Sequence, residues 1–194
     1  MRRTLLFILL LAAFGSAVAQ QHAKKPAALK PEDTGPVSVT RSATLQVPIA
    51  SDAVTVFSYL SDQQKLMTWF PEQAILEPQF GGKYHFRWKD QEPLDGVVTG
   101  YLAANMLAYT WKRPSDVTET QVRFKLSPQG GQTMVDLEHS GFASADDLDK
   151  AVKFWVFYLQ NLRSVIEEQT DLRQVKAKTT KPPAHVVPRS RKKG

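Results

Sequence analysis

Apolar and polar residues alternate along much of the middle of the chain, which is the period of a β-strand with one buried face. The alternation predicts a first strand within residues 37–49. Similar short segments follow, separated by Pro, Gly and Asn-Met turns, and predict six more strands at 74–78, 83–89, 95–103, 106–112, 118–127 and 132–140. Because the connections are short, we expect successive strands to pair as an antiparallel meander.

Three other segments carry apolar residues at helical spacing. Ser51 is the expected N-cap of a first short helix, and a second short helix ends before Pro71. The third helix is much longer, because apolar residues recur at steps of three and four from Leu148 to Ile166 after a capping sequence at Ser144. A stripe of about five turns needs a broad apolar partner, so this helix is expected to pack on the concave face of the sheet. The predicted fold class is α+β.

The two ends of the chain differ in composition from the middle. Residues 1–19 have a basic start, an apolar run and small residues up to Ala19, the pattern of a Sec-type signal peptide cleaved after that residue. We expect a disordered linker at 20–36, one folded domain at 37–172 and a basic disordered tail at 173–194. The expected location is periplasmic or secreted, with no transmembrane segment after cleavage.

The positive charge of the chain is concentrated at its ends. The formal net charge is +6, yet residues 36–172 hold 12 basic and 17 acidic residues. Residues 173–194 hold eight basic residues, no acidic residue and no aromatic residue for base stacking. We therefore expect no nucleic-acid partner, and at most a weak contact of the tail with an anionic envelope surface. The chain has no cysteine, so neither a disulfide nor a lipid-modified cysteine is available.

An aromatic motif follows the glycine pair Gly81-Gly82. The glycines permit a tight turn, and the strand after them alternates aromatic residues with basic residues or histidine. A period of two places Tyr84, Phe86 and Trp88 on one face. Three adjacent aromatic side chains on a sheet must be covered by another element or by a ligand.

If the long helix covers the sheet, the inward face is rich in aromatic side chains with polar tips. The residues predicted to line a pocket there are Tyr84, Phe86, Trp88, Tyr101, Tyr109, Trp111, Phe124, His139, Trp155 and Tyr158. The same alternation places Val97 and Thr99 inward. An apolar wall with a few polar anchors is the usual composition of a small-molecule site. The alternative, in which these residues simply form the core, stays open.

His139 is the strongest single candidate for a polar anchor in that pocket. Its neighbours Asp136 and Glu138 are expected to point outward, so no partner for general acid–base catalysis is evident, and we predict no catalytic residue. The alternative is a core histidine satisfied by a Tyr hydroxyl or a backbone carbonyl. No cofactor motif is found, and no metal site is expected, because His85 and His139 lie on opposite faces and cysteine is absent.

Several short motifs also match a known family in order and spacing. They are Val47–Asp62, Trp69-Phe70, Glu77-Pro78 with Gly81–Phe86, Tyr109–Trp111, Thr133–Phe142, and Trp155 with Leu159 and Leu162. Together they resemble the START-like SRPBCC superfamily and, within it, the AHSA1-like family named after the activator of Hsp90 ATPase. The resemblance covers Val39 to Gln169. It implies a helix-grip fold (START/Bet v 1-like): a strand, two short helices, a six-stranded antiparallel meander and a long C-terminal helix, with a deep cavity for small apolar molecules.

The resemblance leaves three functions open, because fold alone does not settle function. The main hypothesis is an exported protein that binds or carries a small hydrophobic molecule, either a lipid or an aromatic compound. The rivals are an envelope protein-interaction module of the co-chaperone kind, and a cyclase or hydratase that uses His139 with Tyr84 or Tyr109. Export would separate the chain from cytosolic Hsp90, and the extra N-terminal domain of the eukaryotic activator is not found here. A role with Hsp90 is therefore not expected.

Overall fold

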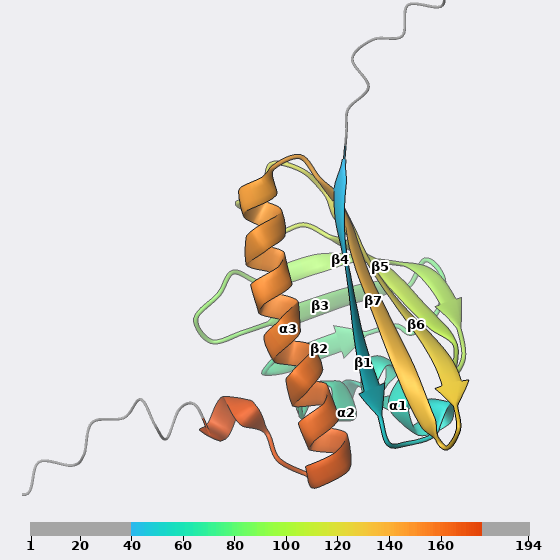
Figure 1. Ribbon diagram of the computed structural model, residues 1–194. Coiled ribbons are helices and arrows are strands. Elements are labelled where there is room, and N and C mark those ends of the chain that lie inside the picture. Colours follow the sequence, from blue (N-terminus) through green and yellow to red (C-terminus); the bar gives the residue numbers. More distant parts are fainter. Residues whose placement is uncertain (1–39, 176–194) are drawn as a thin grey trace, which may run out of the picture. The chain divides into compact units, whose positions relative to one another are not determined.

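The computed structural model describes residues 40–175, which form one antiparallel sheet, three helices and a last short helical segment at 172–175 (Figure 1). The elements are β1 Arg41–Ile49, α1 Ala53–Ser61, α2 Gln63–Met67, β2 Gln73–Leu76, β3 Lys83–Arg87, β4 Leu94–Leu102, β5 Met106–Trp111, β6 Thr120–Gln129, β7 Gln132–Phe142 and α3 Ala145–Glu168. Their order is the predicted one, and the α+β helix-grip prediction is confirmed. The predicted signal peptide and linker, and all of the predicted tail beyond residue 175, lie outside the described residues.

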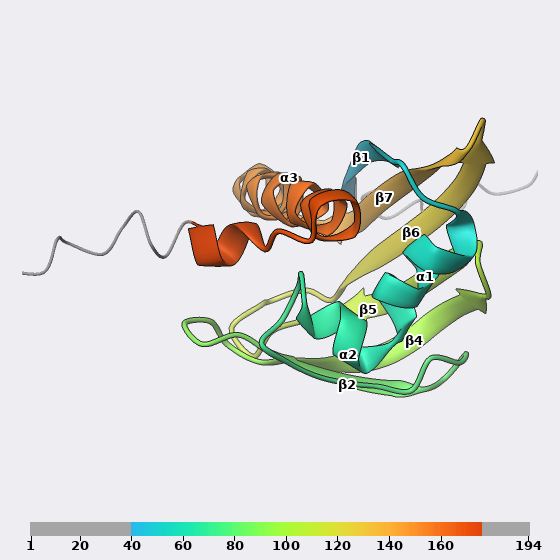
Figure 2. The same ribbon diagram turned by 90° about the horizontal axis from the view of Figure 1, so that it is seen from below.

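The seven strands form a single sheet in the order β1-β7-β6-β5-β4-β3-β2. Strands β2 to β7 are the predicted meander, and β1 extends it at the β7 edge, with Leu45 opposite Leu137. The sheet is curved, with α3 across its concave side and α1 and α2 at one end of the same side (Figure 2). This arrangement removes the apolar stripe of α3 from water, which is the largest favourable contribution available to a helix of this kind.

Side-chain caps fix where the helices begin. Asp52 caps α1, its carboxylate accepting a hydrogen bond from the backbone N–H of Thr55 at 2.9 Å. The prediction that Ser51 is the cap is wrong by one residue, because the side chain that accepts from the first turn is that of Asp52. Ser144 caps α3 as predicted, its hydroxyl accepting from two backbone N–H groups of the first turn at 3.1 and 3.4 Å.

Phe70 occupies the centre of the concave face. It lies between α2 and β2, its side chain is fully buried, and the ring of Trp69 stacks beside it at 4.9 Å between centroids. The ring of Phe70 also meets aromatic rings from both layers, at centroid distances of 5.1 to 6.4 Å: Phe86, Trp88, Trp111, Phe154, Trp155 and Tyr158. The space that the family resemblance assigned to a ligand is therefore filled at this point by the chain itself.

The register of β4 differs from the prediction at its centre. Val97 and Thr99 were expected inward, but Val97 is 40% exposed while Val98 is 1% exposed and pairs with Tyr109. The two adjacent valines made the alternation ambiguous. Gly96 resolves it, because this residue points inward and a Cβ there would lie 2.7 Å from the ring of Tyr84.

A β-bulge between Val98 and Gly100 then shifts the register of β4. The extra residue brings Tyr101 opposite Leu107, which is buried, so Tyr101 returns to the inner side of the sheet. There it contacts the ring of Phe57 at 5.6 Å and remains 37% exposed. Tyr101 therefore lies at the end of the sheet, where α1 covers it.

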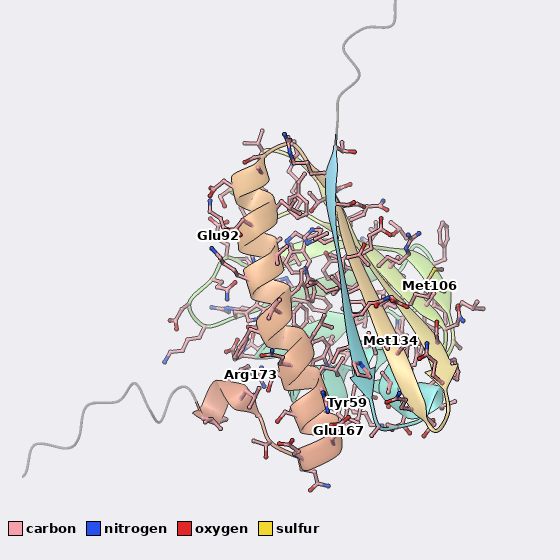
Figure 3. All side chains as sticks on the ribbon, in the orientation of Figure 1. Tyr59, Glu92, Met106, Met134, Glu167 and Arg173 are labelled. Carbon is pink, nitrogen blue, oxygen red and sulfur yellow. The ribbon has the colours of Figure 1, made fainter. Side chains whose placement is uncertain are left out.

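The folded part continues beyond the predicted boundary at residue 172. The guanidinium of Arg173 donates to the backbone carbonyl of Phe70 at 3.1 Å, and Asn161 of α3 donates to that of Trp69 at 2.7 Å. Arg173 was assigned to the basic tail, yet it holds the segment that carries the central aromatic side chain. Figure 3 shows Arg173 beside α3, well away from its first turns.

Candidate functional site

A cavity of about 740 Å³ opens between the first turns of α3, the end of β7 and the loop 112–119 that joins β5 to β6. Its apolar wall consists of aromatic side chains: Trp111, Phe142, Phe154 and Trp155. Its polar lining residues include Gln91, Arg113, Ser115, Asp116, Thr118, Ser144, Asp147 and Lys150. A volume of roughly 300 to 1,000 Å³ with this composition is typical of small-molecule sites.

His139 belongs to the cavity wall, and both of its ring nitrogens are hydrogen-bonded. The indole N–H of Trp155 donates to Nδ1 at 2.9 Å, so Nδ1 acts as the acceptor. Nε2 therefore carries the proton of the neutral ring and donates to the hydroxyl of Thr120 at 2.8 Å. That hydroxyl in turn donates to the backbone carbonyl of Trp111 at 3.1 Å. The network fixes one tautomer of the imidazole.

The protonation state of His139 follows from its surroundings. Burial, and to a smaller extent the positive charge of Arg113, lowers the pKa of His139 to about 3, so the ring is neutral at ordinary pH. Its expected inward position is confirmed, but its partners are an indole and a threonine hydroxyl, not the tyrosine hydroxyl or carbonyl expected. A general base needs a nitrogen within hydrogen-bond reach of a substrate proton, and here both nitrogens are engaged.

Arg113 places a positive charge against the aromatic wall. Its guanidinium carbon lies 5.5 Å from the ring centroid of Trp111 and 5.6 Å from that of Phe154, which is cation–π geometry. Nη2 donates to the side-chain oxygen of Gln91 at 3.2 Å, while Nε is buried without a hydrogen-bond partner. The backbone N–H of Arg113 donates to the carboxylate of Asp116 at 2.7 Å, which helps to hold the loop in place.

Two loops form the outer wall of the cavity and are joined to each other. Glu92, beside the first half of α3 in Figure 3, accepts hydrogen bonds from the backbone N–H and the hydroxyl of Ser115 at 3.1 and 2.6 Å. These bonds lower the pKa of Glu92. Val117, also on the loop that carries Ser115, is 93% exposed. Val117 is therefore an exposed apolar side chain at the edge of the cavity.

The structure divides the predicted pocket residues into two groups. Trp111, His139 and Trp155 line the cavity. The others do not line it and, apart from Tyr101, are buried in the packed interior: Tyr84, Phe86, Trp88, Tyr101, Tyr109, Phe124 and Tyr158. In that interior the hydroxyl of Tyr84 donates to the backbone carbonyl of Thr110, and burial raises the pKa of both Tyr84 and Tyr109.

Most residues of the cavity were not predicted from the sequence. Among them are Phe154, Arg113 and Phe142, the last of which was named only as the end of a motif. For Arg113 the available signal was Pro114, because a proline so soon after Trp111 places the residue before it in a loop at the end of the strand.

The described part of the chain contains neither a metal-binding cluster nor a membrane-spanning helix. Within residues 40–175 no three His, Asp or Glu side chains gather in a way that would hold a metal ion. No helix in the same range combines the length and the apolar character needed to cross a bilayer.

A curved antiparallel sheet around a long C-terminal helix, with a cavity beside the first turns of that helix, defines a helix-grip protein of the SRPBCC class. The family model described as "Activator of Hsp90 ATPase homolog 1-like protein" matches residues 50–167. Since this is more than half of the sequence, the chain belongs to that family. No curated protein matches the sequence.

Solved structures share the fold at low sequence identity. Protein MLL2253 from Mesorhizobium loti superposes with a TM-score of 0.62 at 19% identity, over 67% of this chain and 99% of that one. CalU16 from Micromonospora echinospora gives 0.59 at 19%, over 72% and 83%. The Aha1 dimer from Colwellia psychrerythraea gives 0.61 at 18%, over 66% and 97%. At these identities the likeness establishes the fold and nothing finer.

Proposed function

We propose that this protein binds and carries a small, largely apolar molecule in the cavity at the start of α3. The observation that carries the proposal is the cavity itself, about 740 Å³ with one aromatic wall and polar and charged side chains around it. Each Å² of apolar ligand surface removed from water there contributes about 25 cal/mol. Membership of a family with a ligand-binding or co-chaperone-like fold is consistent with this function.

The hydrogen bonds of His139 and Tyr84 favour a binding function over catalysis by these two residues. Both nitrogens of His139 are engaged, and the hydroxyl of Tyr84 is committed to a backbone carbonyl. A cyclase or hydratase using these groups would have to break buried hydrogen bonds before each proton transfer, and each such bond is costly to leave unmade.

The proposed site lies at one end of the concave face, beside the first turns of α3, and not in the deep interior of the fold. Phe70 fills the centre of the concave face, and its ring contacts those of Trp111 and Trp155, which form the inner wall of the cavity. A ligand would therefore lie on top of the aromatic core, beside α3, with the loop 112–119 over it.

We further propose that the protein acts outside the cytoplasm, since residues 1–19 have the composition of a cleaved signal peptide. Cell fractionation with detection of the N-terminus tests this: a mature chain beginning at Gln20 in the exported fraction supports it, and an intact cytoplasmic chain refutes it. Weak binding of the basic tail to anionic vesicles is best tested by deleting residues 176–194, which leaves Arg173 in place.

A protein-interaction module is the second candidate, and one surface favours it. Ile75 and Phe80 are 61% and 77% exposed, and Val97 is 40% exposed on the outer side of the same short-stranded edge. In-cell crosslinking of the wild type and of Phe80→Asp tests it. A specific partner that is lost in the variant would support the module.

The test of the main proposal compares two variants of one helix. Ala151 lines the cavity and Val156 is exposed on α3 without lining it. Ala151→Phe should fill the cavity and weaken the binding of 2-naphthol, a neutral aromatic probe, at least about tenfold, while Val156→Phe should not change it. Native mass spectrometry with solvent extraction would name a co-purifying molecule. Equal probe binding by the two variants, or none by the wild type, would refute the proposed site.

A further inference from the structure

Arg113 is a cation without a carboxylate partner in its own fold. The ion pairs among residues 40–175 involve other cations, and the side-chain hydrogen bond given to the Arg113 guanidinium goes to the neutral amide of Gln91. Its Nε–H is buried and unpaired. An unpaired donor on a charged group costs free energy, so the hydrogen-bonding capacity of the guanidinium is not fully used within the fold.

The anions near Arg113 are already committed to other groups. Asp116 accepts the backbone N–H of Arg113 itself, and Glu92 accepts both hydrogen bonds of Ser115. Asp147, on the far side of the cavity, lies 3.6 Å from Lys150. These contacts tie the loops and the helix start together, and within residues 40–175 they leave the guanidinium without a carboxylate at ion-pair distance, although its charge helps to lower the pKa of Glu92.

The start of α3 cannot serve as the anion site instead. The hydroxyl of Ser144 already accepts from the backbone N–H groups of Asp146 and Asp147. Lys150 is neutralised by the same two acids, at 2.6 and 3.6 Å. Among the cavity residues in the described range, Arg113 is therefore the cation that forms no ion pair within the chain.

We propose that the ligand of this cavity is an organic carboxylate, with its anionic group on the Arg113 guanidinium and its apolar body on the aromatic wall. The inference rests on the proposed function and names the chemical class of the ligand. The rings of Trp111 and Phe154 hold the guanidinium within the wall, and a planar fork of N–H donors matches the two oxygens of a carboxylate.

The charge of the surroundings selects a single negative charge. Asp116 and Asp147 line the same cavity, and Glu92 lies on the adjoining loop. One cation with no direct ion pair in the described residues balances one carboxylate, whereas a phosphate ester with nearly two charges would bring additional negative charge close to these acids. The site therefore favours a monoanion with an apolar body.

The experiment compares pairs of probes that share an apolar body and carry either a carboxylate or a neutral polar group. The aromatic pair is 2-naphthoate and 2-naphthamide, and the aliphatic pair is decanoate and decanol. Binding to the full chain is followed by calorimetry and by tryptophan fluorescence, since Trp111 and Trp155 line the cavity. We expect the carboxylate of at least one pair to bind about tenfold or more tightly than its neutral analogue. The pair that shows the larger preference identifies the apolar body.

Two charge-removing variants assign the preference to one residue. Arg113→Gln should reduce the carboxylate preference to about one while affinity for the neutral probe is kept. Lys112→Gln removes the same charge from the exposed neighbouring position and should leave the preference intact. Arg113→Lys, which keeps the charge but loses the fork, should retain only part of it.

The outcomes distinguish a failure of the carboxylate assignment from a failure of the proposed binding function. Binding of the neutral probe without a carboxylate preference, or a preference that survives Arg113→Gln, overturns the carboxylate assignment and leaves the cavity as a neutral apolar site. Failure of all four probes to bind the folded wild-type chain overturns the proposed function as well.

Discussion

Replacing Phe70 with alanine tests whether this side chain is what closes the deep cavity of the fold. Phe70 is fully buried, and its ring stacks on Trp155 at 5.3 Å and meets Trp111 at 6.4 Å. Both of those residues line the existing cavity. Removing the ring should therefore join an interior void to the mouth pocket and give the deep cavity that the family resemblance implied.

The free energy of unfolding should fall by about 3 to 5 kcal/mol in Phe70→Ala. The upper part of this range applies, because aromatic rings from the sheet and from α3 surround the site and leave little freedom to collapse into the void. A domain of this size commonly has about 5 to 15 kcal/mol of stability, so the variant should still fold. Phe70→Leu should lose less, since most of the volume is kept.

Urea unfolding measures the loss, and ligand rescue tests the cavity. Indole or naphthalene at about 100 times its dissociation constant should restore about 2.7 kcal/mol to Phe70→Ala and much less to the wild type. Phe80→Ala is the matched control, because Phe80 is 77% exposed and its loss should change stability little. A loss below about 1 kcal/mol in Phe70→Ala, or no difference in rescue, would refute the claim that Phe70 fills the cavity.

Three further predictions follow from single contacts. The pKa of His139 is about 3 in the folded state against the ordinary 6.5. The contribution of His139 to the free energy of unfolding is therefore fully present above pH 6.5 and falls by about 1.4 kcal/mol per pH unit as the pH drops toward 3. His139→Gln should flatten this dependence in urea titrations at several pH values. Arg173→Met should lower the free energy of unfolding in urea by about 2 to 4 kcal/mol, because three backbone carbonyls lose a charged donor. As a control, Arg163→Met removes an exposed arginine and should have little effect. Gly82→Ala would place a Cβ 2.1 Å from the carbonyl oxygen of Glu77, so its melting temperature should fall by several degrees; an unchanged value would contradict the close packing of that turn.

Much of the fold could be predicted from the sequence, because its strongest signals are local. The steps of three and four after Ser144 and the alternation in β6 and β7 report directly which face of each element is buried. The Asn-Met and Gly-Gly turns report where the chain reverses. These signals need no knowledge of distant residues, and the order of elements and the meander followed from them.

The errors occurred where neighbouring strands decide the outcome. By sequence alone, either of the two adjacent valines of β4 could face inward. The pairing of β4 with β5 places Val98 on the inner face, and a bulge follows before Tyr101. The end of the domain was placed before Arg173 because its sequence neighbours are basic, although its partners are carbonyls more than a hundred positions away. A change in amino-acid composition along the chain cannot show that a residue contacts another one more than a hundred positions away.

The sequence by itself determined that aromatic side chains with polar tips gather between a sheet and a helix. Only the tertiary structure decided that Phe70 fills the centre of that space, that His139 is fully hydrogen-bonded and that Arg113 faces the remaining cavity. The physical reason is that periodicity assigns a side chain to a face of its own element. Whether that face meets a ligand or another ring depends on volumes and hydrogen-bond partners that other segments of the chain bring to it.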